Sequence, residues 1–180
     1  MSRLAQLIAV TIYIFPCGFA SGGEIPAKSV NGWPGMPYSR VIGYSFDNPH
    51  SKDDVFTLLR DDKLNEAQLK EFKTKEAPLN AAQVERLLNA AFSSKIRILG
   101  AACYEPHHVF VFYDRDAKPV AAIEICFHCD KLVSLPEKDT DWHHDFAALA
   151  RLSWELGLGL GSPKLTLDGY LELLKQRHGD

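Results

Sequence analysis

Two β-rich runs joined by a short turn constrain the fold of this chain more than any other feature of its sequence. The runs cover residues 107–113 and 120–127, and both are rich in the aromatic and β-branched residues that strands favour. Between them, residues 114–119 read Asp-Arg-Asp-Ala-Lys-Pro, a composition typical of a hairpin turn. The sequence therefore predicts an antiparallel hairpin in the second half of the chain.

The register of this hairpin follows if the turn closes with Asp114 opposite Pro119. His107 then lies opposite Cys126, at the open end of the hairpin. A slip of one residue would move His107 to the face opposite Cys126, so the predicted grouping depends on this register.

Alternation of side chains along the strands then assigns each residue to a face of the sheet. One face collects His108 with the apolar residues Phe110, Phe112, Ile123 and Ile125, and the other collects His107, Glu124 and Cys126, with His128 near their end. Beyond the strands, the same pairing places Cys103 beside Cys129 and Asp130. We therefore expect thiol and imidazole groups to gather at one end of the hairpin.

Residues 1–20 have the three zones of a signal peptide. A positive start at Arg3 precedes an apolar run over residues 4–15, and small residues precede a predicted cleavage after Ala20. The run is shorter than the roughly 20 apolar residues that span a bilayer, so we expect no stable membrane span. The sequence predicts a periplasmic or secreted protein. A lipoprotein anchored through Cys17 is the alternative, which the bulky residues before that cysteine oppose.

Thiolate and imidazole groups are the ligands that zinc prefers, and four of them complete a tetrahedral site. The candidate ligands are Cys103, His107, Cys126 and Cys129, with His108 or His128 as substitutes. A strong zinc pattern has two Cys-x-x-Cys pairs, whereas here the first half supplies only Cys103 and His107. The expected cofactor is therefore none or a transition metal, of which zinc fits best.

The same cysteines permit two other interpretations. A disulfide would join Cys126 to Cys129, or Cys103 to one of these two, and would leave one thiol over. Redox-active thiols would resemble the dithiol of thioredoxin-like proteins, but no βαβ pattern surrounds Cys126. Because export leads into an oxidising compartment, we favour the disulfide.

Length and composition indicate one soluble domain. The chain has 180 residues, of which 46% are hydrophobic and 24% charged. A net charge of −3 without a basic stripe argues against nucleic-acid binding. Residues 21–39 are rich in Gly and Pro and are predicted to form a tether, which leaves a single domain over residues 40–180.

Apolar periodicity predicts three helices around the hairpin. These are residues 81–92 after the N-cap Asn80, residues 142–156 after Asp139 or Thr140, and residues 167–177 after Thr166. A first strand is expected over residues 40–46, whereas residues 51–75 fit either a helix or a strand. We therefore predict an α+β fold, in which an antiparallel sheet with a central hairpin is packed by about three helices.

Two further polar groups have ordinary explanations. We expect His143 and His144 to lie in a solvated first helical turn, since they do not form the H-E-x-x-H arrangement of metalloproteases. Glu124 beside His107 would suit acid–base chemistry, but ordinary strand polarity explains it as well. No nucleophile with an orienting partner is evident from the sequence.

Around the hairpin, the sequence resembles an uncharacterised family of small exported bacterial proteins. The shared pattern is Cys-x-x-Pro-x-His, then Phe-Tyr-Asp, then Ile-Cys-Phe-x-Cys. Here it consists of Cys103, Pro106 and His108, residues 112–114, and residues 125–129. The family has no assigned activity, so the resemblance implies no function. It implies that His108, more than His107, belongs to the shared motif.

These observations favour an exported, non-catalytic binding or interaction domain with a Cys/His structural centre, held by a disulfide or by a transition metal. An envelope protein and a small ligand both fit as its partner. The alternative is an enzyme that uses the same cluster, as a metal-dependent hydrolase or as a thiol oxidoreductase.

Overall fold

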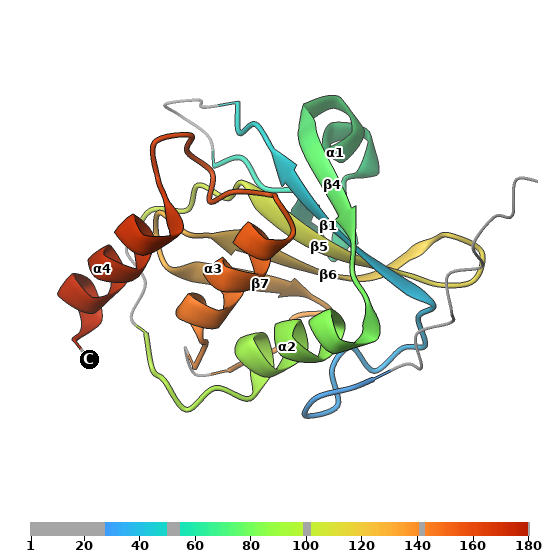
Figure 1. Ribbon diagram of the computed structural model, residues 1–180. Coiled ribbons are helices and arrows are strands. Elements are labelled where there is room, and N and C mark those ends of the chain that lie inside the picture. Colours follow the sequence, from blue (N-terminus) through green and yellow to red (C-terminus); the bar gives the residue numbers. More distant parts are fainter. Residues whose placement is uncertain (1–27, 50–54, 99–101, 141–142, 180) are drawn as a thin grey trace, which may run out of the picture.

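The computed structural model describes residues 28–49, 55–98, 102–140 and 143–179. Within these residues the chain has the predicted α+β fold, built on a five-stranded antiparallel sheet in the order β4-β1-β5-β6-β7 (Figure 1). The strands of this sheet are β1 (Arg40–Phe46), β4 (Lys73–Pro78), β5 (His108–Tyr113), β6 (Pro119–Cys126) and β7 (Lys131–Leu135). A two-stranded sheet pairs β2 (Leu59–Arg60) with β3 (Lys63–Leu64), and the helices are α1 (Glu66–Phe72), α2 (Ala81–Phe92), α3 (Phe146–Glu155) and α4 (Leu167–His178).

The predicted hairpin is β5 and β6, and its register is confirmed over most of its length. His108 pairs with Ile125, and Val109 pairs with Glu124. The register shifts at the closed end, where Tyr113 rather than Asp114 pairs with Pro119. The Asp114 carboxylate accepts hydrogen bonds from the backbone N–H groups of residues 116 and 118, at 2.9 and 2.8 Å, and so takes part in the turn instead of the ladder.

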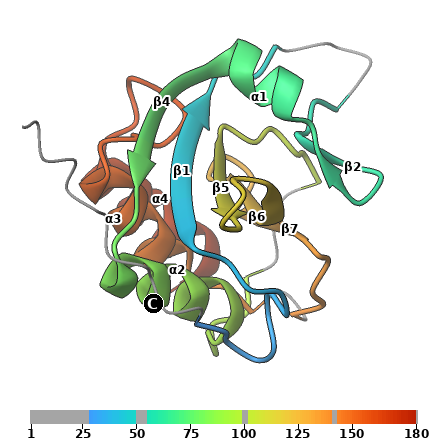
Figure 2. The same ribbon diagram turned by 90° about the vertical axis from the view of Figure 1, so that its right-hand side faces the viewer.

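The two faces of the sheet bury different clusters, as the alternation predicts. Phe110, Phe112, Ile123 and Ile125 belong to the larger core beneath α2, α3 and α4. Val109, Val111 and Ala122 belong to a smaller core with residues of α1 and the two-stranded sheet. Figure 2 shows α2, α3 and α4 on one side of the sheet and β2 on the other.

Two of the predicted helices are confirmed with their caps. At the start of α2, Asn80 and Gln83 form a capping box, and the apolar face of this helix is buried. Thr166 caps α4, and Gly179 ends it with a φ of 80°.

The helix predicted over residues 142–156 begins later than expected. Its N-cap is Asp145, whose side chain accepts from the N–H of Ala148 at 2.8 Å, and α3 therefore starts at Phe146. The backbone before it is held by α2 instead, because the N–H of Asp145 donates to Ala90 O. Trp142, the first residue of the predicted helix, falls outside the described residues.

The sequence did not predict β4, α1 or β7 as separate elements, although α1 lies within residues 51–75, which fit either a helix or a strand. Strand β4 has almost entirely exposed side chains, because it is an edge strand that pairs only with β1. Helix α1 has one buried residue, Leu69. Strand β7 is short and forms the other edge of the sheet.

The described part of the predicted tether, residues 28–39, packs onto the domain. Trp33 is only 2% exposed, and its ring contacts Phe92 and Phe112 with centroids 4.5 and 5.0 Å apart. Its indole N–H donates to Pro136 O at 2.8 Å. This segment is therefore part of the core, because one large aromatic side chain outweighs the surrounding turn residues. Residues 21–27 and the predicted leader lie outside the described residues.

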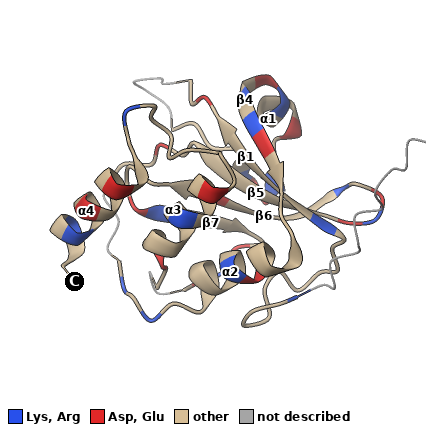
Figure 3. Ribbon diagram, in the orientation of Figure 1, with Lys and Arg blue, Asp and Glu red and all other residues tan. Residues whose placement is uncertain are grey.

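Over the described residues, no helix is long and apolar enough to cross a membrane. Basic and acidic residues are mixed along the helices and strands, without a stripe of one sign on the part of the chain drawn in Figure 3.

Candidate functional site

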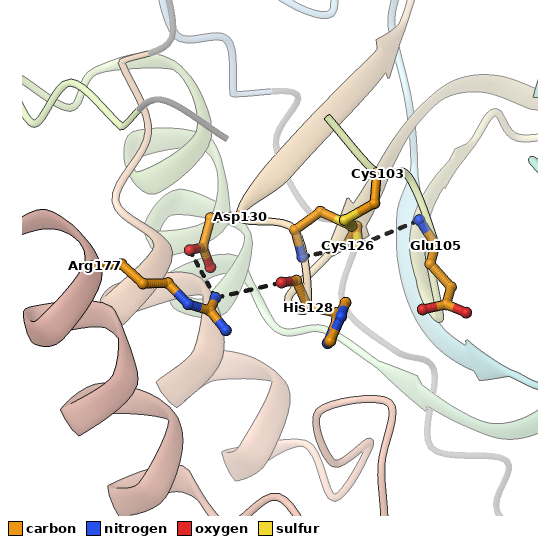
Figure 4. Close-up of a disulfide and its surroundings, with 7 residues drawn as sticks. Cys103, Glu105, Cys126, His128, Asp130 and Arg177 are labelled. Atoms are coloured by element: carbon orange, nitrogen blue, oxygen red, sulfur yellow. Dashed lines mark hydrogen bonds and ion pairs between the residues drawn. A yellow bond between two sulfur atoms is a disulfide. The ribbon is translucent and has the colours of Figure 1, made fainter. Parts of the chain in front are cut away.

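A disulfide joins Cys103 to Cys129 at the open end of the β5–β6 hairpin (Figure 4). The two Cα atoms lie 5.9 Å apart, within the usual range for a disulfide bridge. This is one of the pairings that the sequence allows, and the register predicts the juxtaposition because it places Cys103 beside Cys129. Cys126 is the remaining free cysteine of the described residues, and it is buried.

The sulfur of Cys126 lies within the same centre. It accepts hydrogen bonds from the backbone N–H of Cys129 at 3.2 Å and from that of Glu105 at 3.4 Å. Burial raises the pKa of this thiol, whereas the hydrogen bonds that its sulfur accepts from backbone N–H groups lower the pKa. Cys103, in contrast, is exposed to solvent.

Glu124 forms a buried network on the same face of the sheet as Cys126. Its side chain is fully buried and accepts three hydrogen bonds. The donors are Thr57 Oγ1 at 2.6 Å, Leu58 N at 2.7 Å and Tyr104 Oη at 2.8 Å. Strand polarity was therefore the wrong explanation for this residue. Glu124 holds two loops, one before β2 and one before β5, against the sheet.

The network perturbs the titration of its own members. Burial raises the pKa of Glu124, although the hydrogen bonds from Thr57, Leu58 and Tyr104 lower it. Burial and the adjacent charge of Glu124 raise the pKa of Tyr104 well above 10. Tyr104 is therefore a neutral donor over the ordinary pH range, and it does not act as a base there.

The two neighbouring histidines lie apart from the cysteines and from each other. His107 Nδ1 donates to Phe46 O at 3.1 Å, and its ring packs against Gly161. His108 lies on the opposite face, fully buried, where Nε2 donates to Gly159 O at 3.0 Å. Because a carbonyl only accepts, the proton of neutral His108 is on Nε2, and its Nδ1 is a buried atom without a partner.

The four expected metal ligands are thus not assembled in this arrangement. Two of the cysteines form the disulfide, and His107 faces another part of the molecule. Over the described residues, no group of three or more His, Cys, Asp or Glu side chains is placed to hold a metal ion. The zinc interpretation stays a prediction that requires the bridge to be reduced.

Burial lowers the pKa of His108 to about 4, with a contribution from His107. A depressed pKa stabilises the fold above the unfolded value of 6.5, and this stability is lost as the pH falls towards 4. We expect the free energy of unfolding to decrease by up to about 3 kcal/mol across this window. Urea unfolding at pH 7, 5.5 and 4 measures the loss, and His108→Gln should lose less. An equal loss in that variant would contradict the assignment to His108.

A second polar cluster, which the sequence did not predict, lies behind the disulfide. Asp130 follows Cys129 and is buried, and its carboxylate accepts from Tyr170 Oη at 2.7 Å and Arg177 Nη1 at 3.0 Å. His178 Nε2 lies 3.0 Å from the same carboxylate. These partners all come from α4, so this cluster anchors the last helix to the turn that carries Cys129. No local signal links residues so distant in sequence.

The two histidines before α3 also differ from the expectation. His144 is buried rather than solvated, and its Nδ1 donates to Ala91 O at 2.8 Å. Burial lowers the pKa of His144. This side chain therefore joins α2 to the start of α3.

A cleft of about 270 Å³ opens beside His107. Its polar lining comes from Ser45, Asp47, Thr74, Lys75, His107 and Ser162, and its apolar lining includes Phe46, Leu158 and Leu160. Gly161 has a φ of 84°, and a Cβ atom there would lie 3.0 Å from the His107 side chain. The glycine therefore lets the loop after α3 approach the histidine and form one wall of the cleft.

Comparison with family models, with curated proteins and with solved structures finds no match. The resemblance to small exported bacterial proteins therefore stays a prediction.

Proposed function

We propose that this chain is an exported, non-catalytic binding domain in which the cysteine centre is a structural staple. The observation that carries the proposal is the burial of every member of that centre except Cys103. Glu124 and Cys126 are 0% exposed and Cys129 is 1% exposed, so a substrate has no access to them. A catalytic site keeps an open position in a cleft, whereas these groups bond to the loops that cover them.

We propose the cleft beside His107 as the binding site. It combines a carboxylate at Asp47, an ammonium group at Lys75 and hydroxyl groups with an apolar wall. A few convergent polar groups over an apolar surface are typical of ligand sites, and about 270 Å³ suits a small molecule. We therefore propose a small polar ligand.

A thermal-shift experiment tests this site with glycine, alanine, acetate, phosphate and glucose as probes. A ligand at about 100 times its Kd stabilises the fold by about 2.7 kcal/mol, so we expect at least one probe to raise the melting temperature. Lys75→Ala should abolish the shift, while Lys70→Ala, an exposed lysine of α1, should retain it. Shifts of equal size in both variants, or none in the wild type, would count against the cleft.

Export is part of the proposal, supported by the signal-peptide pattern of residues 1–20 and, weakly, by the disulfide. Intact-mass measurement of the protein from the cell envelope is expected to give an N-terminus near Ser21. A chain that retains Met1 would contradict export with cleavage, and a lipid on Cys17 would support the lipoprotein alternative.

The metal-dependent hydrolase is distinguished from this proposal by metal analysis together with a free-thiol count. The structural staple predicts one free thiol in the mature protein and no effect of a chelator on the melting temperature. Stoichiometric zinc with Cys103, Cys126 and Cys129 all reduced would support the metal alternative instead, because each thiolate ligand must be deprotonated and unbridged.

A further inference from the structure

Three sulfur atoms meet at the open end of the hairpin, and only two of them are bonded to each other. The sulfur of Cys126 is 3.2 Å from the backbone nitrogen of Cys129, and 3.4 Å from that of Glu105, two residues after Cys103. Figure 4 shows it beside the bridge between Cys103 and Cys129. A thiol and a disulfide are therefore held together in one centre, in which Cys126 and Cys129 are buried and Cys103 is exposed.

We propose that Cys126 exchanges with the Cys103–Cys129 bridge, so that the centre exists as two disulfide isomers. The Cys126 thiolate attacks the sulfur of Cys129, the bond to Cys103 breaks, and a Cys126–Cys129 bond forms. Cys103 leaves as a thiolate and takes up the proton that Cys126 lost. One disulfide and one thiol are present before and after, so the step needs no external oxidant or reductant.

The new bond is compatible with the local chain. Cys126 ends β6, β7 begins at Lys131, and the Cys-x-x-Cys spacing across this short turn is the one used by exchangeable dithiols. The two backbone N–H groups that bond to the Cys126 sulfur also favour its thiolate form. Burial opposes ionisation, so the exchange is slow at neutral pH and becomes faster as the pH rises.

The exchange changes which cysteine is accessible. In the described isomer the free thiol is the fully buried one, whereas in the other isomer it is the solvent-exposed Cys103. The segment around Cys103 remains attached, since Tyr104 donates to Glu124 and Asn48 donates to Pro106 O at 3.0 Å. The second isomer thus presents a surface thiol that can form a mixed disulfide with a partner protein. This activity goes beyond ligand binding at the His107 cleft and does not depend on it.

Trapping the second isomer tests the proposal. The oxidised, folded protein is incubated with N-ethylmaleimide, quenched with acid, digested with pepsin without reduction, and mapped by mass spectrometry. We expect molecules that carry the label on Cys103 and a Cys126–Cys129 bridge. The proposal is overturned if every labelled molecule carries it on Cys126 with the Cys103–Cys129 bridge intact, or if only the unfolded protein is labelled.

Two variants complete the test. Cys126→Ala keeps the original bridge and lacks the attacking thiol, so labelling of Cys103 should fall at least tenfold. Cys103→Ala removes the original bridge, and the exported protein should contain a Cys126–Cys129 bridge and no free thiol. Two free thiols in a folded Cys103→Ala protein would show that the second isomer cannot form, and this holds even if Cys126→Ala does not fold.

Discussion

Replacing Cys103 and Cys129 together by alanine is expected to lower the free energy of unfolding by about 3.5 kcal/mol. The bridge closes a loop with a sequence separation of 26, and the entropy that a loop of this length removes from the unfolded chain corresponds to that value. Denaturant unfolding of the oxidised wild type and of the double variant measures the difference.

The matched control is Cys126→Ala, which removes a buried thiol without removing the bridge. It should cost about 1 to 2 kcal/mol, because it leaves a small cavity and removes a weak sulfur acceptor from two backbone N–H groups. Dithiothreitol should lower the stability of the wild type towards that of the double variant and leave the double variant unchanged. If Cys126→Ala proved as costly as the double variant, the bridge would have to involve Cys126.

Glu124→Ala is expected to destabilise the fold by about 4 kcal/mol. The substitution leaves the donors on Thr57, Leu58 and Tyr104 without their acceptor, and each buried unpaired donor costs about 1 to 3 kcal/mol. The loss of side-chain volume adds a cavity. Denaturant unfolding at pH 7 measures the effect.

Glu124→Gln is the control, because it keeps the volume and one acceptor oxygen and should cost much less than Glu124→Ala. Because glutamine does not titrate, comparison with this variant also shows how the ionisation of the Glu124 carboxyl group affects stability. Since the pKa of Glu124 is raised in the folded state, its contribution to stability is fully present below the unfolded value of 4.5 and decreases as the pH rises through the folded pKa. The wild type should therefore gain stability relative to Glu124→Gln as the pH is lowered. A difference that does not change with pH would contradict the raised pKa.

The sequence was sufficient to predict the hairpin, its register and two helix caps. These features depend on short-range rules: the turn chemistry of residues 114–119, the alternation of side chains along each strand, and the capping side chains of Asn80 and Thr166. The register then predicted that Cys103 lies beside Cys129. The proximity of the two bridged cysteines could therefore be predicted from local sequence patterns alone.

Only the tertiary structure decided which atoms in that centre bond to each other. The partners of Glu124 include Leu58, 66 positions earlier, and Asp130 is bonded by side chains of α4 that lie 40 to 48 positions later. Likewise, the edge strand β4 has no apolar alternation, because its pairing with β1 comes from backbone groups that every residue carries.

The arrangement of the cysteines and histidines likewise depends partly on local sequence and partly on tertiary packing. Their types and spacing predicted a cluster, but a zinc site, a bridge and a redox pair all use the same residues. The choice depends on the direction of each side chain. Cys103 and Cys129 point to each other, while His107, just before β5, and His108, its first residue, point to opposite faces because successive side chains of an extended chain alternate. The types and spacing of the cysteines and histidines determined which kinds of site this chain could form. The packing of segments distant in sequence determined which of these sites the folded chain contains.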